Sequence, residues 1–504
     1  MFRLILLIAL VTGALTSVTA LAQERITLVP LVSESYGIES VVPEDWVDVG
    51  GGIVARQASA TDATLLAQQS APVPKDDVLT SLLPQLGLSE PPESTGAHQG
   101  GALNWTLYEA ETLGVAVDLA LAEEDHTTYI VAFQTSPVER DALRASLFLP
   151  VLDAFAPLEV SDEPVPYDIE EVTFANGEIS LAGTLTLPPG GGPHPAVVLV
   201  SGSGPQNRDE SLGGGIAIRP FKLLADALTR AGLAVLRYDD RGTGASTGTF
   251  STATVSDFAR DAAAAVGYLR SRDDIDTNRV GLLGHSEGGL VAAMLAPGNR
   301  DLGFVVALAG PAVNGRELLK LQNQRMFEAE GATEEEIAAQ LEFVEALFGV
   351  VDDPAAIEDL AHERAIEQIE ALPDEQRESL GDIEQYARSV ADQLAQQYGS
   401  AWFVSFLNYD PTEDWAQMTQ PLLAIYGGKD VQVGADQNAP ALEAALRRAG
   451  NEQYEIVVLP NANHLFQEAE TGSVSEYARL PAEFTSDLVP TIIEWLKDEG
   501  IIHG

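Results

Sequence analysis

The sequence predicts an α/β fold with a mostly parallel sheet and a helical insertion, preceded by a small α+β domain. Three observations predict it. From about residue 170 onward, apolar runs of strand length alternate with amphipathic helical segments, as parallel strands joined by crossover helices require. Residues 313–406 interrupt this alternation with a helical region rich in Glu, Ala, Gln and Leu. Before residue 159, short strands with alternating side chains indicate a separate module.

Each expected element follows from a local pattern. In the first module, alternation predicts strands at residues 114–120 and 128–133, with a helix near 140–155. In the main domain, apolar runs predict strands at residues 195–200, 233–238, 280–283, 303–309, 421–426 and 454–459. Helical spacing and composition predict helices at residues 221–229, 255–269, 289–295, 334–348 and 383–397. The last two lie in the insertion, which we expect to cap the carboxyl end of the sheet.

Residues 1–22 carry the pattern of a secretory signal peptide. An apolar run from Leu4 to Val11 follows a basic residue, and small residues end at Ala22. Because this run is too short to span a membrane comfortably, we expect cleavage after Ala22 and no stable membrane insertion. The remaining segments are an α+β domain over 23–158, an acidic linker over 159–169 and the main domain over 170–504. We therefore expect an exported protein, periplasmic or extracellular.

The composition limits the classes of partner and cofactor. The 504 residues include 76 Asp plus Glu against 28 Lys plus Arg, a formal net charge of -48. Such a charge repels polyanions, so nucleic acid and anionic membranes are not expected as partners. The chain has no cysteine, which excludes disulfides and thiolate metal sites. We expect no metal and no organic cofactor, and the composition carries no signal about oligomeric state.

Ser286 stands at a sharp turn between a strand and a helix. The strand Val280–Leu283 ends in Gly-His-Ser-Glu-Gly, residues 284–288, and a helical run follows directly. Such a turn holds the serine hydroxyl clear of the sheet in a strained conformation, and the flanking glycines prevent clashes. We therefore predict that Ser286 is a catalytic nucleophile. A second Gly-x-Ser-x-Gly match, residues 244–248, follows a polar loop and precedes no helical pattern, which predicts an ordinary turn.

His464 is the histidine best placed to serve Ser286. A serine nucleophile needs an imidazole to take its proton and an acid to hold that imidazole's tautomer. At turns of this kind the acid and the histidine follow the serine in the chain. His464 lies in a turn directly after the strand 454–459, whereas His362 lies in the insertion and His503 at the end of the chain.

Asp430 is the predicted orienting acid. It follows the strand 421–426 after a turn that contains two glycines. The alternates, Asp410 and Asp414, both lie before that strand. Because the carboxyl ends of parallel strands meet at one edge of a sheet, Asp430 is the better placed of the three.

Two backbone amides are expected to stabilise the oxyanion of a tetrahedral intermediate. One is the amide of Glu287, at the N-terminal end of the helix that follows the turn. The other comes from the loop after the strand 195–200, where Ser203 is the first choice and Gly202 the second. His285 projects from the neighbouring backbone position, so we expect it to pack or to shape the turn rather than to reach Ser286.

Three motifs carry a resemblance to a known family: residues 201–210, 237–242 and 284–289. With them the chain resembles, over about residues 172–496, a branch of bacterial α/β-hydrolases similar to dienelactone hydrolases and serine aminopeptidase-like enzymes. The resemblance implies an alpha/beta-hydrolase fold with a catalytic triad, and the insertion at residues 313–406 would form a helical cap above Ser286. The loop after the predicted strand 195–200 departs from the common His-Gly pattern of the family because it carries Ser201-Gly202. Residues 36–46 loosely resemble the start of small exported domains of the PsbP type.

The predicted function is that of a serine hydrolase that cleaves carboxylic esters through an acyl-enzyme intermediate. The expected substrate is a small-molecule ester or a short peptide. The first alternative is a peptidase of the serine aminopeptidase type, in which the acidic insertion would grip a free amino end. The second is a binding protein on a hydrolase scaffold without catalysis, and a complete Ser-Asp-His set argues against it.

Overall fold

The protein is described by a computed structural model. It describes residues 26–33, 36–50, 52–56, 62, 64–71, 73–82, 91–112, 115–124, 127–158, 164–212, 216–299, 301–371, 377 and 383–503. The signal segment predicted for residues 1–22 lies outside these residues, as do residues 159–163 of the predicted linker. In the part of the chain that is described, no helix is long and apolar enough to cross a membrane.

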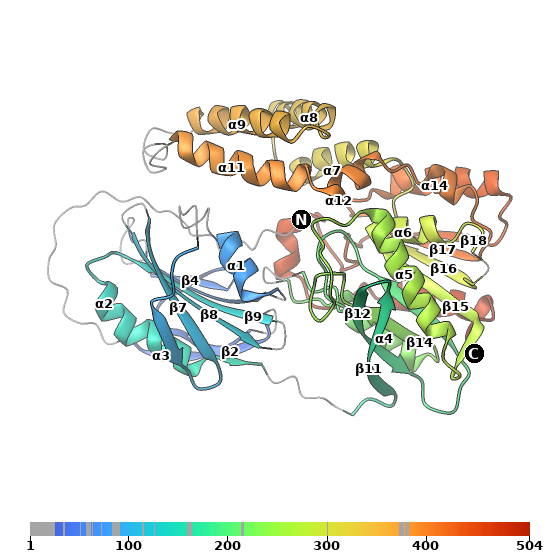
Figure 1. The fold of residues 1–504 in the computed structure, drawn as a ribbon, viewed down its shortest axis with the longest axis horizontal. Coiled ribbons are helices and arrows are strands. Elements are labelled where there is room, and N and C mark those ends of the chain that lie inside the picture. The colour runs from blue at the N-terminus through green and yellow to red at the C-terminus, as the bar shows by residue number, and fades with distance from the viewer. Residues whose placement is uncertain are drawn as a thin grey trace.

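The first domain is built around an antiparallel sheet (Figure 1). Seven described strands form it in the order β3-β4-β5-β9-β8-β7-β6, and β1-β2-β10 form a smaller sheet. Apolar side chains of helix α1 pack on one face of the larger sheet, and those of α2 and α3 pack on the other. The bounds are β1 (Leu28–Ser33), β2 (Ile38–Pro43), β3 (Val47–Gly50), β4 (Ile53–Ala55), β5 (Leu65–Ala71), α1 (Lys75–Leu82), β6 (Gly96–Gln99), β7 (Asn104–Thr112), β8 (Val115–Glu124), β9 (Thr127–Thr135), α2 (Arg140–Leu143), α3 (Leu149–Ala154) and β10 (Ala156–Pro157).

The main domain contains an eight-stranded sheet among the described residues, in the order β11-β12-β14-β13-β15-β16-β17-β18. The six strands β14, β13, β15, β16, β17 and β18 are parallel to one another. At one edge of the sheet, β12 pairs antiparallel with β14 and forms an antiparallel hairpin with β11. The bounds are β11 (Asp168–Asn176), β12 (Ile179–Leu187), β13 (His194–Val200), β14 (Ala234–Tyr238), β15 (Ile275–His285), β16 (Phe304–Leu308), β17 (Leu422–Gly427) and β18 (Tyr454–Leu459). The predicted fold class is confirmed.

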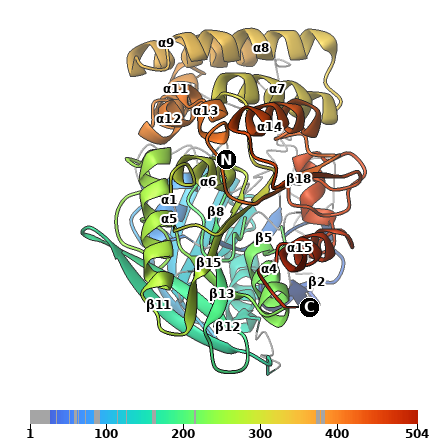
Figure 2. The ribbon, with the colours of Figure 1, turned by 90° about the vertical axis from the view of Figure 1, so that its right-hand side faces the viewer.

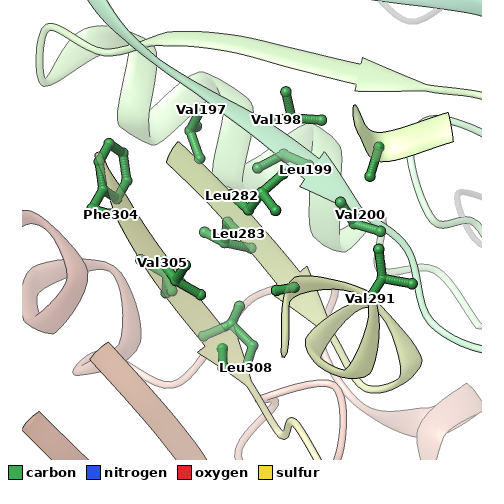
Figure 3. Close-up of a cluster of buried hydrophobic side chains, with 14 of the residues drawn as sticks. Val197, Val198, Leu199, Val200, Leu282, Leu283, Val291, Phe304, Val305 and Leu308 are labelled. Atoms are coloured by element: carbon green, nitrogen blue, oxygen red, sulfur yellow. The ribbon is translucent and has the colours of Figure 1, made fainter. Parts of the chain in front are cut away.

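Helices cover both faces of this sheet. Helices α5 and α6 pack against each other and against β15, and α4 packs against α15; the two pairs lie on opposite sides of the sheet (Figure 2). Apolar side chains of β13, β15 and β16 fill the space beneath α6 (Figure 3), which makes the start of α6 a rigid platform. The bounds are α4 (Pro220–Arg230), α5 (Val255–Arg270), α6 (Glu287–Leu295), α14 (Ala435–Ala449) and α15 (Leu488–Asp498).

The insertion between β16 and β17 forms a helical layer over one end of the sheet (Figures 1 and 2). Two of its contacts place it above the starts of α6 and α5: the indole of Trp402 donates to Glu287, the first residue of α6, and the amide of Val255, the first residue of α5, donates to Ser405. The insertion is therefore a cap over the predicted site and not a solvated appendage. Its described helices are α7 (Gly315–Ala329), α8 (Glu334–Gly349), α9 (Pro354–Glu370), α11 (Ile383–Tyr398), α12 (Ala401–Asn408) and α13 (Thr412–Trp415).

Candidate active site

Ser286 lies at the apex of the turn between β15 and α6. Its backbone has φ 53° and ψ −116°, a strained conformation for a residue with a side chain. A Cβ on Gly284 would lie 2.1 Å from the Gly288 carbonyl oxygen, and one on Gly288 would lie 2.0 Å from that of Val200. The two glycines are thus required because strand and helix approach each other closely. The turn holds the half-buried Ser286 side chain at the carboxyl end of the sheet.

His464 and Asp430 form a buried pair. The Nδ1 atom of His464 lies 2.8 Å from Oδ2 of Asp430, whose side chain is fully buried. The other carboxylate oxygen accepts the backbone N–H groups of Gln432, at 2.7 Å, and Val433, at 2.9 Å. These bonds fix the carboxylate, which in turn holds the proton of His464 on Nδ1 and leaves Nε2 as a proton acceptor.

The alternates to these residues are engaged elsewhere. The Asp410 carboxylate accepts from the hydroxyl and amide of Thr412, and the Asp414 carboxylate accepts from Tyr409. His362 faces Glu384 inside the cap, with 3.4 Å between Nε2 and Oε1. The Ser246 hydroxyl, in the second motif match, donates to the Asp239 carbonyl. The next helix, α5, begins only at Val255, so no helix follows this serine directly and the match is not a nucleophile turn.

The loop that carries His464 packs against the Ser286 turn through His285. The Nε2 atom of His285 lies 2.9 Å from the His464 carbonyl oxygen, and the two rings are 4.8 Å apart. No hydrogen bond joins the Ser286 hydroxyl to His464 within the described residues. Such contacts are often loose in structures without substrate and tighten when it binds.

The loop after β13 borders the nucleophile. A Cβ on Gly202 would lie 3.3 Å from the Ser286 Cβ. The Gly202 amide, however, donates to Oε1 of Glu210 at 2.8 Å. The Gly202 N–H thus already has an acceptor in this structure, which argues against the second choice of oxyanion donor. The amides of Ser203 and Glu287 remain, and the Ser203 side chain is hydrogen-bonded to the Glu287 carboxyl.

Two buried carboxyl groups, those of Asp240 and Glu287, form hydrogen bonds with the loop after β13. Asp240 accepts from the Ser201 hydroxyl and from the Gln206 amide, each at 2.9 Å. Burial raises the pKa of Asp240 well above its usual range. Burial also raises the pKa of Glu287 to about 7, against the lowering effect of its bonds to Trp402 and Ser203. The Trp402 indole nitrogen lies 3.0 and 2.8 Å from the two Glu287 oxygens. Because Glu287 also bonds to Ser203, it connects the cap to the loop after β13, residues 201–210, which we call the oxyanion loop.

Sequence reasoning missed Glu210, Trp402 and the role of the Glu287 side chain. Glu210 is 75 residues from its partner His285, and Trp402 is 115 residues from Glu287. No local spacing signals such pairs. Among the residues described, no cluster of three or more metal-ligating side chains is present. A cavity of about 940 Å³ lies between Ala329 and residues 468–486, and none of the three predicted triad residues lines it.

Comparisons with known proteins agree with this architecture. A family model described as "Alpha/beta hydrolase family" matches residues 197–475, more than half of the 504 residues. Esterase EstD of Thermotoga maritima is 27% identical over 336 residues, which span 66% of this chain and 68% of that protein.

Two solved structures are also similar to the chain. The Pyrococcus furiosus esterase Pf2001 has 17% identity and a TM-score of 0.39 over 66% of this chain and 91% of its own. The dienelactone hydrolase of Anabaena variabilis has 18% identity and a TM-score of 0.35 over 66% of this chain and 98% of its own.

Proposed function

The chain belongs to the alpha/beta hydrolase family, and we propose that within it the protein is a serine hydrolase that cleaves carboxylic esters. The observation that carries the proposal is the buried His464–Asp430 pair, whose His464 loop is hydrogen-bonded to His285 beside the strained Ser286. In the proposed reaction the Ser286 hydroxyl attacks the ester carbonyl carbon while Nε2 of His464 takes its proton. The amides of Glu287 and Ser203 bind the oxyanion.

The same groups complete the formation of the acyl-enzyme and then carry out its hydrolysis. His464 donates its proton to the departing alcohol, and the acyl group remains on Ser286. Water then attacks the acyl carbon while His464 accepts a proton from it, and His464 returns that proton to the Ser286 oxygen as the acid product leaves. Asp430 orients the imidazole through both halves of the reaction.

An ester is the favoured substrate class for two reasons. The name of the similar Thermotoga maritima protein is that of an esterase. A peptidase of the aminopeptidase type needs a group that grips the free amino end of its substrate, and the buried carboxyl of Glu287, next to Ser286 in the chain, is already bonded to Trp402 and Ser203.

We also propose that the protein is exported, on the strength of the signal pattern in residues 1–22. The N-terminal domain would then accompany the hydrolase outside the cytoplasm. Its likeness to small domains of the PsbP type assigns it no chemistry.

Labelling and turnover test the proposal together. We expect the mature protein to hydrolyse short p-nitrophenyl esters faster than aminoacyl p-nitroanilides and to react with a fluorophosphonate probe. Ser286→Ala should abolish both signals. Ser246→Ala, which alters the second motif match, should keep both. A mature protein that is folded but neither labels nor turns over any ester would leave the scaffold alternative in place, and preferred cleavage of the anilides would favour the peptidase.

A further inference from the structure

We propose that His285 and Glu210 form a positioning pair that holds the oxyanion loop and the His464 loop against Ser286, and thereby sets the rate of the chemical step. The inference rests on the proposed function and deepens it. Neither residue touches the reacting atoms, so both act through the groups that do.

The geometry joins three segments that are far apart in the chain. Oε1 of Glu210 lies 2.8 Å from the Gly202 amide nitrogen and 2.8 Å from Nδ1 of His285. The opposite ring nitrogen of His285 lies 2.9 Å from the His464 carbonyl oxygen. One imidazole at the end of β15 thus connects the loop after β13 with the loop after β18. The first loop carries an oxyanion donor and the second carries the base.

The proton count on His285 follows from its partners. The His464 carbonyl can only accept, so Nε2 must carry a hydrogen. Nδ1 of His285 faces Oε1 of Glu210, which also accepts the Gly202 N–H. A hydrogen on Nδ1 that is donated to this oxygen gives the ring its second hydrogen bond. Burial lowers the pKa of His285, but the charge of Glu210, its hydrogen bond and the more distant Asp430 outweigh burial and raise it. Both bonds of the ring are then made by donated protons, which fixes its orientation.

The cost of the arrangement supports a functional role. Glu210 has φ 57°, a left-handed conformation that side chains rarely adopt. Its second carboxylate oxygen is buried and has no hydrogen-bond partner among the described residues. A half-satisfied carboxylate on a strained residue destabilises the fold. It persists here at the point where two catalytic loops meet.

Two amide substitutions at His285 separate its bond to Glu210 from its bond to the His464 carbonyl. In His285→Gln the side-chain amide can reach the position of Nε2, which keeps the bond to the His464 carbonyl and loses the bond to Glu210. In His285→Asn the amide stands near the position of Nδ1, which keeps the bond to Glu210 and loses the bond to the His464 carbonyl. Glu210→Gln keeps an acceptor for the Gly202 N–H but removes the charge. His98→Gln, in the His98–Asp153 pair of the N-terminal domain, is the matched control.

The readout is steady-state hydrolysis of p-nitrophenyl acetate by the full mature chain, together with thermal unfolding. We expect kcat to fall about 10- to 100-fold in both His285 variants, with KM within about twofold of wild type, because displaced catalytic groups slow the chemical step. Glu210→Gln should fall in the same direction, and His98→Gln should match wild type. If a His285 variant fails to fold, Glu210→Gln carries the test.

The outcomes distinguish this inference from the proposed function. Variants that unfold at lower temperature but keep the wild-type kcat below their transition would show a purely structural pair and overturn the inference. A wild-type protein that hydrolyses no ester and resists the fluorophosphonate probe would overturn the proposed function instead.

Discussion

Glu287→Gln tests whether burial governs the ionisation of the Glu287 carboxyl, which is hydrogen-bonded to Ser203 in the loop after β13. Burial raises the pKa of Glu287 from 4.5 to about 7. Because one pKa unit corresponds to about 1.4 kcal/mol, ionising this group in the folded protein costs about 3 kcal/mol. Glutamine has nearly the same shape and no charge, and its oxygen can still accept from the Trp402 indole. The substitution therefore removes the cost of the charge while it keeps most of the packing.

The sign of the effect depends on pH. Well below pH 4.5 the carboxyl is protonated in both the folded and the unfolded chain, so it carries no penalty. Between pH 4.5 and about 7 the unfolded chain releases the proton first, and the free energy of unfolding of the wild type falls as the pH rises. Above pH 7 the penalty is complete. Glu287→Gln lacks this decline.

Urea unfolding near pH 5 and near pH 8 measures the difference. Relative to wild type, we expect the free energy of unfolding of Glu287→Gln to be about 2 to 3 kcal/mol higher at the upper pH than at the lower pH. Glu334→Gln, which removes an exposed carboxylate of the cap, is the control and should parallel the wild type. A difference below about 1 kcal/mol between the two pH values would refute the claim that burial governs this carboxyl.

Two further substitutions probe the acid and the turn. Asp430→Asn keeps the shape of the acid but no longer fixes the tautomer of His464, so kcat for p-nitrophenyl acetate should fall about 10⁴-fold with the fold unchanged; a loss below tenfold would remove Asp430 from the triad. Gly288→Ala places a Cβ 2.0 Å from the Val200 carbonyl oxygen, so strand and helix must separate, and urea unfolding should show a loss of about 2 to 4 kcal/mol. A variant as stable as wild type would contradict the close approach.

The triad could be proposed from the sequence because each member has a local signal. Five residues around Ser286 specify the turn, and the strand and helix on either side confirm its context. Asp430 and His464 each follow a parallel strand, β17 and β18, and parallel strands bring their carboxyl ends to one edge. Sequence order and sheet geometry together were therefore enough to pair Asp430 with His464.

The hairpin β11–β12 was not predicted, although Asn176-Gly177 at its turn is a hairpin signal. In β11 the side chains of Ile169, Glu170 and Glu171 face solvent fully or in part, and only Val172 and Phe174 are buried. A strand at the edge of a sheet has one neighbour, so its composition is mixed and its alternation short. The supports of the site were hidden for a different reason, since their hydrogen bonds depend on how distant loops meet.

The charge around the oxyanion loop explains why those supports matter in so acidic a protein. A developing oxyanion is destabilised by nearby negative charge, and four acidic side chains approach this loop: Glu210, Asp239, Asp240 and Glu287. His285 pairs with Glu210, and Arg208 pairs with Asp239. Burial raises the pKa of Asp240 and Glu287, so these two tend to hold protons. The fold thus balances the charge near the proposed oxyanion site while the chain as a whole carries a net charge of -48.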